Sequence, residues 1–456
     1  MKASFAILVL SLVFASLLNF PEGLLIFFVL FTFSLPLGFL SVSLCENESD
    51  KEFLWGLYFL ALAVRTVYGA LFYYLEIWDY FATDARIYNE LGYTLAEYFK
   101  GNFPITEEEE PGLYYRFFSF SGPGWGMYYI VASLYIFIGK NPVAGNFLCA
   151  SIGAAAPVVV YILAKEIYRN SKVAKIASLL VAFMPGFINW SSFMLKDGII
   201  IFLLTLSILM VNRLQKSFNL FYLLLLGVGL LGIISLRFYI FPMFVIAILT
   251  SFLINIGGGS SGSNLAKKII LFLIIGTLIT YIGALIGVHE DIEKYGTLER
   301  LNNARLDQAR TAASGLEEAD VSTVEGAITV LPLGLLYLML APLPWQVTSL
   351  RSALTQPEMV AWWFMIPFLI RGCVYSFRYK LRETLAIMIF TLMLTVGYAI
   401  FQGNIGTAYR QRTQMQVFYF IFVAVGWVLT KEKKETEAAL LALQQARIAR
   451  QFQRQT

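Results

Sequence analysis

Long runs of apolar residues, separated by short polar clusters, dominate the whole chain. Each run measures roughly 15–23 residues, and a helix needs about 20 residues to cross the hydrocarbon core of a bilayer. Only 14% of the 456 residues are charged, whereas soluble domains carry about 25%. Backbone polar groups in lipid must be paired within their own segment, so these runs must be helices. The sequence therefore predicts an all-α, polytopic membrane protein.

The distribution of basic residues predicts how many runs cross the membrane. The runs fall near residues 4–20, 23–45, 53–75, 123–139, 144–164, 176–195, 198–212, 219–235, 238–256, 269–288, 327–345, 358–371, 384–402 and 416–430. Short cytoplasmic loops are rich in Lys and Arg, and the basic connections obey this rule only if the runs 123–139 and 327–345 do not cross. We expect these two runs to be juxtamembrane or re-entrant helices. The chain then has about 12 transmembrane helices.

This topology predicts one membrane domain, residues 1–430, and a cytoplasmic tail, residues 431–456. Two long segments of the domain, 76–143 and 289–357, are expected on the extracytoplasmic face, where their aromatic residues favour recognition or chemistry. Arginines recur in the tail at helical spacing. We expect an amphipathic helix that lies on anionic lipids, with a disordered end or a partner-binding helix as the alternatives.

The first extracytoplasmic segment begins with an acidic residue at the membrane–water boundary. Asp84 follows the apolar run 53–75, and a general base at this boundary could reach a substrate that hangs from a lipid. On a helix, Asp84 and Tyr88 share one face, because residues four apart are neighbours. Asp79 is the competing carboxylate. The alternative role of Asp84 is that of an exposed helix N-cap, which Asp favours.

Two turns between later runs carry cations that could bind an anion. Lys196 and Asp197 lie between two runs, and the alternative is an ordinary capped turn. Arg237 and Tyr239 interrupt an otherwise continuous apolar stretch. An arginine there is costly unless it lies at the interface or meets an anion, so an interfacial anchor is the alternative role of Arg237.

The last predicted extracytoplasmic turn carries two arginines, Arg410 and Arg412, beside glycines and amide side chains. Arginine forms bidentate hydrogen bonds with phosphate. Arginines outside the cytoplasm oppose the usual charge bias, and a phosphate or pyrophosphate ligand explains them. Cytoplasmic placement is the alternative, and the basic clusters on both sides argue against it.

The remaining candidate ligands indicate no defined metal site. The single histidine, His289, is expected to be structural, and the run Glu107–Glu110 to be solvated, because consecutive acids do not converge on an ion. Three scattered cysteines indicate neither disulfides nor zinc. A divalent cation, Mg²⁺ or Mn²⁺, stays open as a cofactor. The net charge of +4 is small, and we expect no nucleic-acid partner.

Several motifs resemble the GT-C superfamily of integral-membrane glycosyltransferases, nearest to its bacterial oligosaccharyl-, mannosyl- and aminoarabinosyl-transferase-like members. The motifs lie within Asp84–Gly101, Gly122–Ala164, Pro185–Asp197, Ala341–Gln346 and Tyr409–Arg412. The pattern covers roughly residues 53–430. The family often has two adjacent acids in its first external loop. Here Ala85 follows Asp84, so only one acid stands at this place, and Asp79 stays open as the catalytic carboxylate.

The resemblance implies transfer of a sugar from a polyprenyl-phosphate donor to a glycan, lipid or protein acceptor. The reaction would proceed with inversion, on the extracytoplasmic face of the plasma (inner) membrane. Asp84 would be the general base, or the hydrogen-bond acceptor that orients the acceptor nucleophile. Arg410 and Arg412, with Lys196 or Arg237, would bind the lipid phosphate. Metal dependence varies within the family.

Two other functions remain open from the sequence. An O-antigen-type polymerase or ligase would depend less on Asp84. A lipid or solute transporter would carry charges deep inside several spans and a two-fold internal repeat, whereas here most charges lie at the ends of the runs and no repeat is evident.

Overall fold

The computed structural model describes residues 1–120, 124–256, 269–270, 272–277, 279–281, 297–311, 315–316, 319–347 and 349–453. These ranges contain helices and no named strand, which confirms the predicted all-α class. The helices are α1 Lys2–Leu18, α2 Leu25–Val29, α3 Leu35–Ser43, α4 Glu48–Tyr74, α5 Trp78–Phe81, α6 Thr83–Phe99, α7 Pro111–Phe118, α8 Trp125–Ile138, α9 Pro142–Tyr168, α10 Ser171–Phe183, α11 Pro185–Ser191, α12 Lys196–Lys216, α13 Leu220–Leu236, α14 Ile240–Ile256, α17 Leu298–Thr311, α18 Val324–Leu340, α19 Leu350–Tyr379, α20 Leu381–Phe401 and α21 Ile405–Gln453.

Helix length and composition confirm the multi-pass membrane class. Among the described residues, seven helices are long and apolar enough to cross a membrane, and the bent pair of α10 and α11 raises this number to eight. They are Glu22–Ser43, α4, α9, α12, α19, α20 and Ile405–Thr436 of α21. The shorter apolar helices include α1, α13 and α14, so the total of about 12 crossings stays a prediction.

The two runs that were predicted not to cross are both shorter apolar helices. The run 123–139 forms α8, which has 14 residues. It therefore spans about 21 Å, less than the about 30 Å of a hydrocarbon core. Residues 327–340 of the run 327–345 belong to α18, which has 17 residues and a proline inside it. Their position relative to the membrane stays a prediction.

The centre of the bundle is α9, which packs against α4, α10 and α12. Nearly every residue of α9 is buried, including the small residues from Gly153 to Ala156. Small residues let membrane helices approach closely. A Cβ atom added at Gly153 would clash with the Cβ of Ser191, so this glycine lets α11 pack closely against α9. This contact places α11 deep inside the protein.

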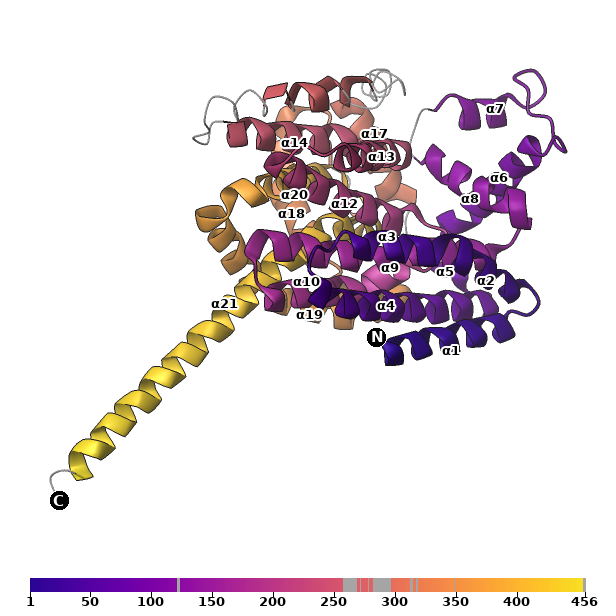
Figure 1. Ribbon diagram of the computed structural model, residues 1–456. Coiled ribbons are helices and arrows are strands. Elements are labelled where there is room, and N and C mark those ends of the chain that lie inside the picture. The colour runs from indigo at the N-terminus through magenta and orange to yellow at the C-terminus, as the bar shows by residue number, and fades with distance from the viewer. Residues whose placement is uncertain are drawn as a thin grey trace.

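Figure 1 shows two parts that extend beyond this bundle. Helices α6, α7 and α8 stand together at its side, with α6 packed on α8. The C-terminal part of α21 projects away from the bundle as one long helix. Because α21 is continuous from Ile405 to Gln453, the chain has no structural break at the predicted boundary after residue 430. The membrane contact of the tail stays a prediction.

Several details differ from a simple reading of the apolar runs. The run 176–195 is broken, because α10 ends before Pro185 and α11 continues at an angle of 55°. Proline lacks the N–H group that a continuous helix needs. Glu107–Glu110 is exposed, as predicted. His289 lies outside the described residues.

Candidate active site

Asp84 lies in the first turn of α6, directly after the short helix α5. The first turn of a helix favours a carboxylate, because the N-terminal N–H groups carry partial positive charge. The Asp84 side chain is 40% exposed, and its Oδ2 atom accepts a hydrogen bond of 2.6 Å from Nη1 of Arg410. Asp79 belongs to α5, and its side chain is not among the described ones.

Asp197 lies in the first turn of α12 and is fully buried. Both of its oxygens accept hydrogen bonds from arginine. Nη2 of Arg237 donates to Oδ1 over 2.8 Å, and Nε of Arg410 donates to Oδ2 over 2.8 Å. Arg237 follows α13 and is also buried. A carboxylate that is completely removed from water needs such partners, because an unpaired buried charge is strongly destabilising.

Arg410 therefore connects the two carboxylates, Asp84 and Asp197. Its guanidinium also lies over the ring of Trp190, 5.3 Å from the centroid, where the face of an aromatic ring attracts a cation. The groups around Arg410 of α21 come from α6 and from the neighbouring helices α11 and α12, and both of these regions are far from α21 in the sequence. We call Asp84, Asp197, Arg237 and Arg410 the charge cluster.

Three further predicted residues adjoin the charge cluster. Nη1 of Arg237 donates to the Tyr239 hydroxyl over 2.7 Å. A Cβ atom added at Gly124 would lie 2.9 Å from Nζ of Lys196 and 3.2 Å from the hydroxyl of Tyr88, so these two polar groups meet beside the same glycine. Burial raises the pKa of Tyr88, and its hydroxyl therefore keeps its proton at neutral pH.

Arg412 is the one predicted site residue with a described side chain that the fold directs elsewhere. Residues two apart on a helix do not face each other, so Arg410 and Arg412 point in different directions. Arg412 is buried and donates to the backbone carbonyls of Leu338, over 2.6 Å, and Ala341. It holds the C-terminal end of α18 and does not contact the charge cluster.

A cavity of about 1080 Å³ adjoins the charge cluster. One part of its wall is polar and includes Asp84, Arg351, Ser352, Thr355, Thr407 and Arg410. Another part is apolar and includes Ile7 of α1, Val64, Val67 and Leu71 of α4, and Leu354 of α19. A cavity with these two surfaces suits an amphipathic ligand that has a charged head and an apolar chain.

Two residues of this region were not predicted from the sequence. Arg351, the second residue of α19, lies over the rings of Tyr80 and Phe81 at 5.1 and 5.8 Å, and no described carboxylate pairs with it. An isolated arginine at the start of a long apolar run is the signal that could have revealed it. Glu358 is buried and accepts hydrogen bonds from Gly186 N–H and the Tyr409 hydroxyl, over 2.7 and 2.6 Å.

The described residues do not identify ligands for a divalent cation. They contain no group of three or more His, Cys, Asp and Glu side chains that could hold a metal. The carboxylates of Asp84 and Asp197 already accept from guanidinium groups. The chemistry of the charge cluster is that of carboxylates and arginines.

The fold and the charge cluster define a polytopic membrane protein that can hold a charged group next to lipid. Residues 88–282 match the family model described as dolichyl-phosphate-mannose-protein mannosyltransferase. The match covers less than half of the chain, and it includes Lys196, Asp197 and Arg237 but begins after Asp84. No curated protein gives a significant match. The matched family is a GT-C family, and the match therefore supports the interpretation of this chain as a membrane glycosyltransferase of the GT-C type.

Proposed function

We propose that the protein transfers mannose from a polyprenyl-phosphate donor to an acceptor hydroxyl on the extracytoplasmic face of the plasma (inner) membrane. The observation that carries this proposal is the placement of Arg410 between Asp84 and buried Asp197, at the wall of a cavity with polar and apolar surfaces. The description of the matching family names the sugar and a protein acceptor. A protein hydroxyl is therefore the first acceptor to test, followed by glycan and lipid hydroxyls.

The cavity provides separate surfaces for the two parts of the donor. The phosphate is placed near Arg351 and Arg410, where guanidinium groups offer paired hydrogen bonds. Hydroxyl groups of Ser352 and Thr355 line the same part of the wall. The polyprenyl chain lies along the apolar surface that α1 and α4 form.

The proposed reaction is a single displacement at the anomeric carbon. Asp84 accepts the proton of the acceptor hydroxyl, whose oxygen forms a bond to that carbon. The bond from the anomeric carbon to the phosphate oxygen breaks, and the polyprenyl phosphate leaves with one more negative charge. One displacement inverts the anomeric configuration. Arg410 stabilises the new charge, which is the larger part of such catalysis in a water-poor cavity, and Arg351 holds the phosphate before and during the reaction.

The charge cluster also suggests how the donor prepares the base. In the structure, Arg410 is bound to Asp84. A donor phosphate competes with Asp84 for the same guanidinium and so frees the carboxylate to accept a proton. Asp197 and Arg237 keep Arg410 in place during this exchange, because their contacts lie on the buried side.

Sugar transfer in proteoliposomes tests this function. Polyprenyl-phosphate mannose is supplied to the wild type, to Asp84→Asn and to Glu97→Gln, a control at the far end of α6 whose contacts are Lys100 and Asn102. We expect activity from the wild type and the control, and loss in Asp84→Asn with donor binding retained. Full activity of Asp84→Asn would contradict its role as the base. Absence of transfer by the wild type across a broad donor panel would contradict the donor class.

A further inference from the structure

The break between α10 and α11 leaves two buried backbone carbonyls without helical donors. In a continuous helix, the carbonyl of Val181 would accept from residue 185 and that of Ala182 from residue 186. Pro185 has no N–H group. The N–H of Gly186 donates instead to Oε2 of Glu358 over 2.7 Å. Both carbonyls lie in the buried interior, where an unpaired polar group is costly.

Arg65 of α4 supplies the missing donors. Its Nη1 donates to Ala182 over 2.9 Å, and its Nη2 to Val181 over 3.4 Å. Its Nε donates to the Ser191 hydroxyl over 2.7 Å, at the other end of α11. Arg65 is 1% exposed, and none of these acceptors is a carboxylate. An arginine inside a membrane is expensive unless it has a function, and helix C-terminal carbonyls attract a cation.

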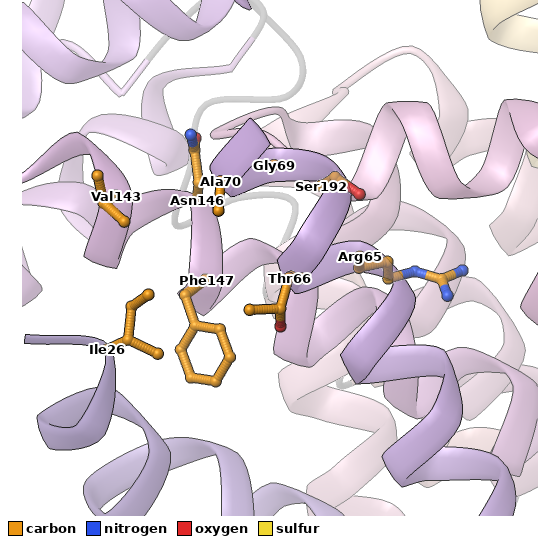
Figure 2. A pocket seen from close by; sticks show the side chains of 10 residues that line it. Ile26, Arg65, Thr66, Gly69, Ala70, Val143, Asn146, Phe147 and Ser192 are labelled. Carbon is orange, nitrogen blue, oxygen red and sulfur yellow. The ribbon is translucent and has the colours of Figure 1, made fainter. Parts of the chain in front are cut away.

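The space beside Arg65 excludes a ligand as the reason for this arginine. The adjacent cavity measures about 10 Å³, which is room for at most one water molecule. Figure 2 shows Thr66, Gly69, Asn146 and Phe147 around it, with the Arg65 side chain extending away from Phe147. The guanidinium of Arg65 therefore has a structural role.

Glu358 completes the arrangement from the opposite side of the break. It accepts from Gly186 at the start of α11 and from the hydroxyl of Tyr409, the residue before Arg410. Further along α11, Trp190 lies under the guanidinium of Arg410. A carboxylate at a helix start and a cation at a helix end each oppose the local partial charge. The carbonyl of Ala182 and the N–H of Gly186 would pair with each other in a continuous helix, and here each of them pairs with a side chain instead.

We propose that Arg65 and Glu358 are positioning residues that hold α11 at its bend and so keep Trp190 against Arg410. A straight continuation of α10 would carry Trp190 away from the cavity wall. The link to catalysis rests on the proposed phosphate-binding role of Arg410, whereas the link to the bend does not. The two parts can therefore be tested separately.

Thermal unfolding of the purified full-length protein in detergent tests the link to the bend. Arg65→Met is compared in the wild-type background and together with Pro185→Ala, which restores an N–H group for the carbonyl of Val181. We expect the loss of Tm caused by Arg65→Met to be smaller in the second background, because both substitutions change the donors that are available to the carbonyl of Val181. Tyr58→Phe is the matched control: Tyr58 lies on α4 and is buried, but it donates to Ser34 and not to α11. Its effect should be the same in both backgrounds.

Sugar-transfer kinetics of the folded fraction test the link to catalysis. We expect Arg65→Met to lower kcat by about tenfold to a hundredfold, because a displacement of about 1 Å far from the chemistry can have such an effect. Arg65→Lys keeps the charge with fewer donors and should give an intermediate kcat. Glu358→Gln, which keeps one acceptor oxygen, should lower kcat less than Arg65→Met and serves as the second variant if Arg65→Met does not fold.

The outcomes separate the proposal from the proposed function. Equal Tm losses in both backgrounds would overturn the role of Arg65 at the bend, whether or not the wild type transfers sugar. An unchanged kcat in folded Arg65→Lys, Arg65→Met and Glu358→Gln would overturn the link to Arg410. If the wild type transfers no sugar but the Tm losses are non-additive, the proposed function fails and the role at the bend stands.

Discussion

Arg410 shows how one residue can serve two carboxylates with different tasks. Asp197 is fully buried and anchors the guanidinium, whereas Asp84 is 40% exposed and faces the cavity. A buried partner fixes the position of the arginine, and an exposed partner can be exchanged for a ligand. Arginine suits this arrangement, because its planar fork carries five donors in fixed directions.

Arg410→Lys should lower kcat by about 10²–10³-fold, because loss of one preorganised donor to a developing negative charge has this effect. Lysine keeps the charge but cannot contact both carboxylates with a planar fork. Transfer assays with saturating donor measure the change. Arg371→Lys is the control, since Arg371 is exposed and donates to Thr430 far from the charge cluster. Equal activity of both variants would contradict the role of Arg410.

Asp197→Asn should destabilise the protein by about 3–5 kcal/mol, because removal of one charge from a buried pair leaves the other charges uncompensated. Asp84→Asn, at a more exposed pair, should change the stability by less than about 1 kcal/mol. Thermal unfolding in one detergent compares the two variants directly. A similar loss of Tm in both would show that burial does not distinguish the two aspartates.

At the scale of elements, the polar residues at the ends of the apolar runs could be predicted to assemble. Charges are costly in lipid, so Asp84, Lys196 and Arg237 gather where helices begin or end. The different roles of Arg410 and Arg412 could also have been predicted, because residues two apart on a helix point in different directions. The contacts of Arg65 could not be predicted, because they depend on backbone carbonyls that a break in another helix exposes. The position of Arg351 could not be predicted either, because it depends on how the start of α19 packs against α5.

The proposed role of Arg351, at the start of α19, is to bind the donor phosphate. Arg351→Gln should raise the KM for the donor about tenfold and change kcat less, because it removes a contact that the phosphate has before and during the reaction. Arg378→Gln, at the exposed opposite end of α19, should leave both constants unchanged. A fall of kcat at constant KM would instead place Arg351 among the groups that act only in the transition state.

For the whole molecule, the sequence predicted an all-helical membrane protein because apolar run length alone requires it. The number of crossings depends on weaker evidence, since several helices are shorter than a full span. The position of α6, α7 and α8 beside the bundle also depends on tertiary packing. Their side of the membrane stays a prediction that labelling can test.

Cysteine labelling in intact cells tests the orientation of the chain. Glu108→Cys should react with a membrane-impermeant maleimide from outside, because residues 107–110 are exposed in the predicted extracytoplasmic segment. Lys431→Cys should react only after the membrane is permeabilised. The wild type is the control, since Cys45 and Cys149 are buried and Cys373 is half-buried. Labelling of Lys431→Cys in intact cells, without reaction of Glu108→Cys, would reverse the topology.

The two arginines at the cavity wall have a consequence for turnover. In the proposed reaction, the spent carrier lipid carries one more negative charge than the donor, so Arg351 and Arg410 would attract the product more strongly than the substrate. The contacts that hold the donor phosphate would therefore also delay departure of the used lipid. A first turnover faster than those that follow is the expected kinetic signature, and accumulated polyprenyl phosphate should act as a competitive inhibitor.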